Sequence, residues 1–176
     1  ALVTDNVGTI QGALANGAST DDSTPTLSGN GQLPGDTISV FDNGILIGTV
    51  PVNPDGTWTF TPDTPLAEGS HDLSIIATNP AGNASEPSDP HIINIDTQAP
   101  AAATATLSDN AGSIIGTIVN GDITDENAPT FTGTAEAGCT VNIYDDGVKI
   151  GSAIVNGTGN WTFTPTTALT DGAHSW

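Results

Sequence analysis

The strongest constraint on how this chain folds is an internal repeat. TDNVGTIQGALANGASTDDSTPTLSG (residues 4–29) returns as SDNAGSIIGTIVNGDITDENAPTFTG (residues 108–133). After the loss of one residue, residues 35–71 align with residues 138–174, and roughly half of these aligned positions are identical. The period is a little over 100 residues, which is much longer than that of solenoid repeats and close to the length of one β-sandwich. The sequence therefore predicts two tandem copies of one domain.

One phrase inside the repeat has the pattern of a half-buried strand. In TWTFT (residues 57–61), Trp58 and Phe60 alternate with threonines, so the aromatic side chains share one face of a strand. Trp161 and Phe163 repeat the pattern in the second copy. The aromatic face is expected to pack against a second sheet.

Turn signals separate further short apolar segments. DNG in the first copy and DDG in the second have residues that tolerate positive φ, and both predict a tight two-residue hairpin. Other strands of the first copy are expected at 8–14, 25–31, 36–41, 45–52, 70–78 and 90–96. About seven short strands at this spacing predict an all-β fold, a tandem pair of immunoglobulin-like β-sandwiches. The expected first core is Leu27, Ile38, Val40, Trp58, Phe60, Leu73, Ile75, Ile93 and Ile95.

The repeat also predicts the domain boundaries. The first copy spans residues 1–96, a short Pro-containing linker spans 97–100, and the second copy spans 101–176. The second copy stops at Trp176, which aligns with Leu73, so counterparts of the last strands of the first copy are missing. Either the segment is cut there or another chain supplies these strands.

Charge excludes several classes of function. The chain has 20 Asp and Glu against a single basic residue, Lys149, and a formal net charge of −19. Binding to nucleic acid or to an anionic membrane surface requires clustered Lys and Arg, so both are excluded. No apolar run approaches the ~20 residues that cross a bilayer, which argues against direct membrane insertion.

Carboxylates in the first copy have no basic side chain to neutralise them, because that copy contains neither Lys nor Arg. In a sandwich, the first loop between strands lies at the same end as Asp96, so Asp21 and Asp22 are expected to join Asp96 in a metal site at the junction. Asp109 is a candidate ligand from the other side of the junction. Oxygen ligands without a His or Cys cluster favour Ca²⁺ over zinc.

The second copy repeats this acidic pair. Asp125 and Glu126 occupy the positions of Asp21 and Asp22, and they predict an equivalent calcium site facing a further domain. The alternative for all these residues is that they form turns by accepting hydrogen bonds from their own backbone.

The sequence gives little sign of an enzyme. Cys139 is the only cysteine and lies among Gly and Thr residues, without the His and Asp neighbours of a catalytic thiol. His71 and His174 occupy matching positions at the start of a strand, which favours a repeated structural role. No serine has an evident His and Asp partner, so we expect no catalytic activity.

Three phrases carry a family resemblance: VFDNGILIGTVPVNPDGTWTFTPDTPLAEGSH, ATNPAGNASEPS and DTQAP. Together with the repeat length, they resemble the bacterial immunoglobulin-like repeats of giant biofilm-associated and repeats-in-toxin (RTX) adhesins. The resemblance implies a stalk of tandem repeats on the bacterial cell surface, with calcium at the domain junctions and adhesive domains elsewhere. Asn79 departs from the family, which often has an acidic residue at that position.

These observations lead to two functional hypotheses. The first is a structural spacer in a secreted surface adhesin, stiffened by calcium and partnered by neighbouring repeats, with any surface ligand bound by domains outside this segment. The alternative is a calcium-dependent module of a secreted protein that binds carbohydrate or protein. The second is weaker, because the tryptophans are expected to point inward and Tyr144 is the only tyrosine.

Overall fold

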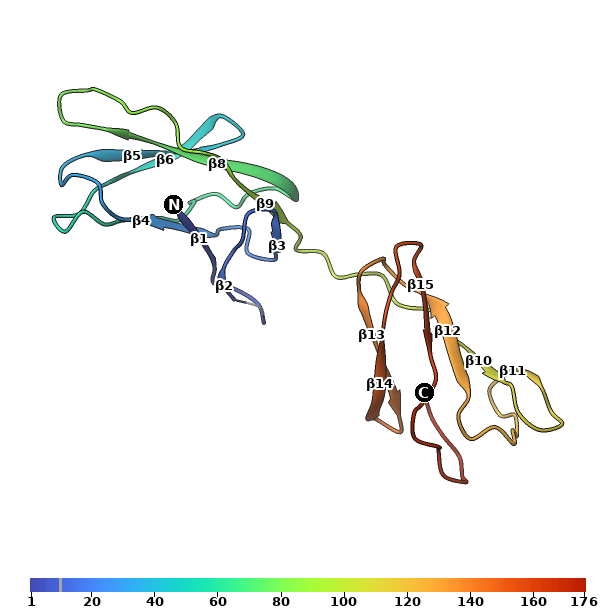
Figure 1. Cartoon of the computed structure of the whole chain (residues 1–176). Helices are drawn as coiled ribbons and strands as arrows, with labels where there is room; N and C mark the ends of the chain where they lie inside the picture. Colours follow the sequence, from blue (N-terminus) through green and yellow to red (C-terminus); the bar gives the residue numbers. More distant parts are fainter. Residues whose placement is uncertain (10) are drawn as a thin grey trace. The chain divides into compact units, whose positions relative to one another are not determined.

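The computed structural model describes residues 1–9 and 11–176 and divides into two compact units, Ala1–Gln98 and Ala99–Trp176 (Figure 1). The strands of unit 1 are β1 (Leu2–Asp5), β2 (Gly12–Ala13), β3 (Ala18–Thr20), β4 (Thr26–Gly29), β5 (Thr37–Asp42), β6 (Ile45–Pro51), β7 (Trp58–Phe60), β8 (Gly69–Thr78) and β9 (His91–Ile95). Nothing in the described part of the chain forms a helix long and apolar enough to cross a membrane.

Unit 1 has two sheets, with strand orders β2-β1-β4-β7 and β3-β9-β8-β5-β6. All pairs are antiparallel except β3 with β9, which run parallel. The buried apolar side chains come from both sheets, so the sheets pack as a sandwich, as predicted. This core consists of Val3, Leu27, Ile38, Val40, Val52, Trp58, Phe60, Leu73, Ile93 and Ile95.

The expected core is confirmed, with Ile75 partly buried at its edge. Trp58 is 2% exposed and Phe60 is 9% exposed, whereas Thr59 between them faces solvent. The alternation of residues along TWTFT therefore has the predicted orientation.

Three short strands near the beginning of unit 1 differ from the prediction. The segment 8–14 forms a strand only at Gly12–Ala13, and Ile10 within it lies outside the described residues. The first strand is instead Leu2–Asp5, whose Val3 is fully buried. The third strand, Ala18–Thr20, was not predicted because its sequence is polar and short, and its strand geometry comes from pairing with β9.

Hairpin geometry matches the sequence. Asn43 and Gly44, between β5 and β6, have φ of 48° and 78°. Asp146 and Gly147 have φ of 47° and 78° at the corresponding turn of unit 2. Two successive residues with positive φ are what a two-residue hairpin requires.

A glycine in the second strand of each hairpin, Gly48 in β6 and Gly151 in β14, has a packing role. A Cβ on Gly48 would overlap the ring of Phe60, and a Cβ on Gly151 would overlap the ring of Phe163. The repeated Ile-Gly dipeptide therefore leaves space for the repeated Trp-Thr-Phe phrase. The contact between this glycine and the phenylalanine ring accounts for the repetition of both segments.

Unit 2 has fewer strands, and every one of its residues is described. They are β10 (Thr106–Asp109), β11 (Gly116–Ile118), β12 (Thr130–Thr134), β13 (Thr140–Asp145), β14 (Val148–Ile154) and β15 (Asn160–Phe163). The sheet β11-β10-β12-β15 matches β2-β1-β4-β7, whereas the second sheet has only β13 and β14. Residues 99–176 thus contain no counterparts of β3, β8 and β9. The core of unit 2 comprises Phe131, Ile143, Ala153, Val155 and Trp161.

We predict that Trp58→Ala lowers the free energy of unfolding of unit 1 by about 3–5 kcal/mol, because it removes a large side chain from between the sheets. Urea unfolding monitored by circular dichroism measures the change. Thr59→Ala is the matched control on the exposed face of the same strand. Equal effects of the two substitutions would contradict the packing described for β7.

Candidate functional site

The predicted metal-ligand residues of unit 1 lie at one end of its sandwich. Thr20 pairs with Ile95 in the parallel ladder, so Asp21 and Asp96 leave neighbouring strands at the same end. The Asp96 amide donates a hydrogen bond to the Thr20 carbonyl at 2.9 Å. The prediction that this loop and Asp96 share an end is therefore confirmed. We call this end, formed by Asp5–Gly8, Asp21–Asp22, Glu68 and Asp96, the acidic end of unit 1.

Asp22 is the most enclosed carboxylate at the acidic end, with 1% exposure. Its Oδ2 accepts a hydrogen bond from the Asn6 amide at 3.0 Å, and its Oδ1 accepts one from the Thr24 amide at 2.9 Å. Asp22 therefore fastens the segment after β1 to the loop that leads into β4. This is the turn-forming role that the sequence offered as the alternative to metal binding.

Asp21 lies beside the backbone of the same segment. A Cβ on Gly8, whose φ is +65°, would overlap its carboxylate. In unit 2 the carboxylate of Asp125 lies in the same way against Gly112, whose φ is +61°. The Asp-Asn-X-Gly phrase at the end of the first strand thus curves around the acidic loop in both units.

Asp96 is exposed, and its Oδ1 accepts a hydrogen bond from the Gln98 amide at 3.3 Å. The next residue, Thr97, donates hydrogen bonds to Glu68 from its backbone amide, at 3.2 Å, and from its hydroxyl. The first residues after β9 are therefore held by two carboxylates of unit 1.

Sequence reasoning missed Glu68 and Asp5 as members of this end. Asp5 is 4% exposed and accepts hydrogen bonds from the Thr20 hydroxyl at 2.6 Å and the Val7 amide at 2.9 Å. The available signal was the repeat, since Glu68 aligns with Asp171 and Asp5 with Asp109. A position that keeps an acidic residue in both copies was a candidate in its own right.

Unit 2 has equivalents of most contacts found at the acidic end of unit 1. Glu126 replaces Asp22 and accepts hydrogen bonds from the amides of Asn110, at 3.4 Å, and Ala128, at 2.9 Å. Asp109 is 2% exposed and accepts hydrogen bonds from the Thr124 hydroxyl and the Ala111 amide.

The sequence made Asp109 a candidate metal ligand at the junction, and its contacts show which loop it belongs to. It ends β10, and the linker enters β10 at the opposite end, at Thr106. Its partners Thr124 and Ala111 both belong to unit 2. Asp109 is therefore the counterpart of Asp5 and belongs to the acidic loop of its own unit.

The donor set at the acidic end of unit 1 suits calcium, because it consists of carboxylate oxygens and unit 1 contains no Lys or Arg. Several of these oxygens already accept backbone hydrogen bonds. Within residues 1–9 and 11–176, the one group of three acidic, His or Cys ligand atoms within 4.8 Å of one another is Asp145, Asp146 and His174, in unit 2. A metal at the acidic end would need side-chain rotation to collect its ligands.

The Asp145, Asp146 and His174 group is better described as a hydrogen-bonded clamp. Nδ1 of His174 lies 2.9 Å from Asp145 Oδ2, and Nε2 lies 2.8 Å from the Thr170 carbonyl oxygen. Both partners are acceptors, so the ring makes both bonds only when both nitrogens carry hydrogen, and it then has no lone pair for a metal.

Unit 1 repeats the clamp. His71 lies 2.8 Å from both Asp42 Oδ2 and the Ala67 carbonyl oxygen. In each unit the imidazole ties the loop before it to the end of a hairpin strand. The geometry agrees with the structural role expected for these two histidines.

Comparison with known proteins gives a family match along the chain. A family described as bacterial Ig-like domain matches residues 3–97 and again residues 101–176. These two matches confirm the predicted immunoglobulin-like sandwiches. No curated protein matches the chain.

Seven chains of solved structures match. One is described as the crystal structure of a tetra-tandem repeat in the extending region of a large adhesion protein, with 20% identity and a TM-score of 0.34. The match covers 87% of this chain and 41% of that chain, so this chain spans less than half of its length.

We predict that Asp22→Ala lowers the stability of unit 1 by about 1–3 kcal/mol in calcium-free buffer, because the Asn6 and Thr24 amides lose their acceptor. Chemical denaturation in the presence of a chelator gives the value. Asp63→Ala, which removes an exposed carboxylate, is expected to have little effect. If Asp22→Ala is as stable as the wild type without metal, the hydrogen bonds of Asp22 contribute nothing, and the presence of an acidic residue at this position in both copies needs another reason.

A second prediction concerns the clamp of unit 2. The Thr170 carbonyl, and then the Asp145 carboxylate, hold the pKa of His174 above its ordinary value of 6.5. Because the folded-state pKa is raised, the clamp contributes fully below the unfolded pKa, and its contribution is lost as pH rises through the folded pKa.

NMR titration of the His174 ring measures this pKa directly. Asp145→Asn is expected to lower it, and Asp146→Asn is expected to lower it less because Asp146 makes no hydrogen bond to the ring. An unchanged titration midpoint in Asp145→Asn would rule out the clamp as described.

Proposed function

Because this chain belongs to the family of bacterial Ig-like domains, we propose that its two units are structural spacers, repeated along the stalk of a large bacterial cell-surface adhesin. The observation that carries the proposal is the tandem repetition itself. The features that recur are those that build the fold: the Trp-Thr-Phe strand, the glycine against its phenylalanine, the two-residue hairpin and the histidine clamp.

The same features argue against a recognition role for the repeated tryptophans. Trp58 and Trp161 are 2% and 5% exposed, so neither offers a platform for a sugar ring. Repeated sandwiches whose repeated tryptophans are buried suit separation of other domains better than ligand binding. Adhesion and biofilm formation then depend on domains that the spacer positions outside the cell.

We further propose that calcium binds at the acidic end of unit 1. Asp96, Asp21 and Asp22 are the proposed ligands, with Glu68 and Asp5 close by in the hydrogen-bond network. When bound, the ion supplies the positive charge that unit 1 lacks. The equivalent site of unit 2 would use Asp125 and Glu126.

Calcium would act on the linker through the residues that begin it. Asp96 itself is a proposed ligand, and Thr97 is bonded to Glu68. Repulsion among the carboxylates of Asp21, Asp22 and Asp96 favours separation of the loop that follows β3 from the end of β9. A shared cation removes that repulsion. Calcium would therefore stiffen the exit from unit 1, and neighbouring repeats would be the chain's principal partners.

We predict that the maximum dimension of the chain in solution is better defined in calcium than in chelator, and that Asp96→Ala in calcium resembles the chelated wild type. Small-angle X-ray scattering of these three samples measures this. Magnesium should substitute poorly, because it demands a compact octahedral shell.

Asp89→Ala removes an exposed carboxylate that precedes β9, at the other end of that strand, and serves as the charge-matched control. It should respond to calcium as the wild type does. Identical scattering of the wild type in calcium and in chelator would refute calcium stiffening but leave the spacer role open. Selective binding of the chain on a glycan array would refute the spacer role.

A further inference from the structure

The chain that joins β8 to β9 lies along β8 before β9 begins. The Ser85 amide donates a hydrogen bond to the Ala77 carbonyl at 2.8 Å, and the Ser88 amide donates one to the Ile75 carbonyl at 2.9 Å. The hydroxyls of the two serines accept hydrogen bonds from the amides of the same β8 residues, both at 3.1 Å. Each serine is therefore fixed to β8 by its backbone and by its side chain.

Each of these serines begins a short phrase of the form Ser-acid-Pro, first Ser-Glu-Pro and then Ser-Asp-Pro. The Ser85 hydroxyl donates a hydrogen bond to the Glu86 carbonyl oxygen at 2.8 Å, and the Ser88 hydroxyl donates one to the Asp89 carbonyl oxygen at 3.1 Å. Because each hydroxyl oxygen also accepts a bond from β8, its own donation is strengthened. The carbonyl before each proline is thus polarised by a fixed hydroxyl.

The peptide bond between Asp89 and Pro90 also has an internal nucleophile. The Asp89 carboxyl reaches its own main-chain carbonyl carbon by closing a five-membered ring, and well-oriented intramolecular attack is equivalent to about 10⁵–10⁸ M of an external reagent. Both residues are exposed, so the carboxyl can turn onto the carbonyl and water reaches the bond. The proline nitrogen carries no hydrogen in the peptide and leaves as a secondary amine.

We propose that unit 1 cleaves its own chain between Asp89 and Pro90 in mild acid. An oxygen of the Asp89 carboxyl bonds to the main-chain carbonyl carbon, the carboxyl proton passes to the Pro90 nitrogen, and the C–N bond breaks. This leaves a cyclic anhydride at Asp89, and one water molecule opens it to two carboxyl groups. The Ser88 hydroxyl stabilises the negative charge that develops on the carbonyl oxygen.

The reacting proton comes from Asp89 itself, so cleavage is faster in acid. Other titratable groups near the bond along the chain are Glu86, in the same segment, and His91, the first residue of β9. Residues 74–78 of β8, along which the segment lies, have no charged side chain. Neither Glu86 nor His91 takes part in the step.

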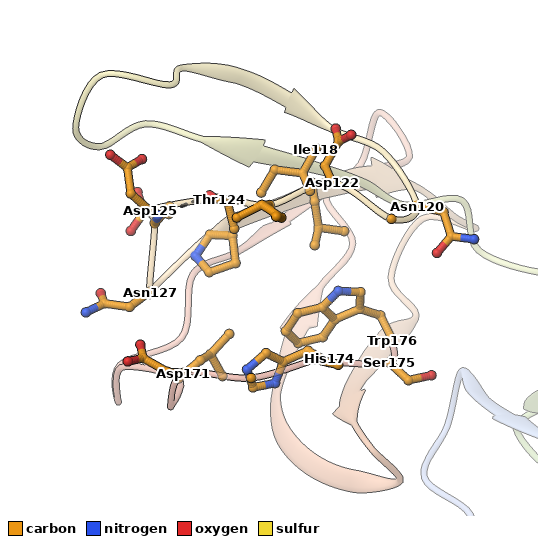
Figure 2. A pocket seen from close by; sticks show the side chains of 18 of the residues that line it. Ile118, Asn120, Asp122, Thr124, Asp125, Asn127, Asp171, His174, Ser175 and Trp176 are labelled. Carbon is orange, nitrogen blue, oxygen red and sulfur yellow. Dashed lines mark hydrogen bonds between the residues drawn. The ribbon is translucent and has the colours of Figure 1, made fainter.

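The chain contains natural comparisons for this bond. The Glu-Pro bond has the same serine contact, but attack by Glu86 must close a six-membered ring and fix one more rotatable bond. Figure 2 shows Asp122, Asp125 and Asp171 in loops of unit 2, and none of them precedes a proline. Asp89 is the one Asp in the sequence that does. Cleavage is therefore expected at a single bond.

Cleavage at this bond leaves unit 1 assembled. β9 begins just after the break and pairs with both β3 and β8, and its Ile93 and Ile95 are 0% and 1% exposed. Residues 1–89 and 90–176 then stay together without a covalent link. In a stalk, a pulling force would act on the pairing of β9 alone, so acid would weaken the tether. This consequence rests on the proposed spacer role, whereas the cleavage does not.

The test incubates the whole chain in mildly acidic buffer and follows it by intact-mass spectrometry. Fragments 1–89 and 90–176 are expected, eluting together in native gel filtration and separately in urea. The folded chain should cleave at least about tenfold faster than the chain unfolded in urea at the same pH, because only the folded chain fixes the Ser88 hydroxyl. This comparison separates the proposal from the general acid sensitivity of Asp-Pro bonds.

Matched substitutions assign the roles. Asp89→Ala should abolish cleavage, and Asp89→Glu should slow it at least about tenfold. Glu86→Asp should create a second cut after residue 86, because it places the same nucleophile beside the same serine contact. Ser88→Ala should slow cleavage about tenfold and Ser88→Thr should restore it, whereas Ser85→Ala, which removes the equivalent contact one phrase earlier, should leave it unchanged.

Three results would overturn the proposal. The first is cleavage of the folded chain no faster than that of the chain in urea. The second is a folded Ser88→Ala variant that cleaves as fast as the wild type. The third is hydrolysis at many bonds at similar rates, which would be ordinary acid hydrolysis. Loss of the spacer role in other experiments would leave all three measurements unaffected.

Discussion

The parallel pairing of β3 with β9 joins the beginning of unit 1 to its end and determines where its acidic residues lie. It involves Ala18, Ser19 and Thr20, three small or polar residues with little strand preference of their own. It joins the last strand of the unit to a segment near its beginning and completes the five-stranded sheet. It also places Asp21 and Asp96 at one end. Unit 2 shows the same sequence segment without a partner strand, and residues 122–124 form no strand there.

The sequence predicted those parts of the fold whose causes are local. The hairpins follow from residues that accept positive φ, and the inward direction of Trp58 and Phe60 follows from alternation. The strands β1 and β3 were missed because their causes are not local. Val3 is buried by contacts with distant strands, and β3 has strand geometry only through β9. Repetition marked both segments as important without indicating their conformation.

The sequence likewise predicted only part of the candidate site. The expected sandwich topology alone predicted the shared end of Asp21 and Asp96, because the first loop between strands lies at the end where the last strand finishes. Glu68 was missed, because its contact with Thr97 depends on how the loop before β8 folds back. The distinction between turn former and metal ligand was also outside the reach of sequence. The structure shows that Asp22 already performs the first role through two backbone amides.

The hairpins β5–β6 and β13–β14 have the same pairing, with a register shift at matching positions, and this likeness has a consequence for biosynthesis. Two tandem domains of closely similar sequence are at risk of pairing strands across the wrong copy, a common route to misassembly in repeat proteins. Translation proceeds from the N-terminus, so β8 and β9 are made long before Thr140–Asp145 leaves the ribosome. By then they have their own partners in β5 and β3. The order of synthesis thus disfavours strand exchange between the copies, and denaturation of the finished chain removes that protection.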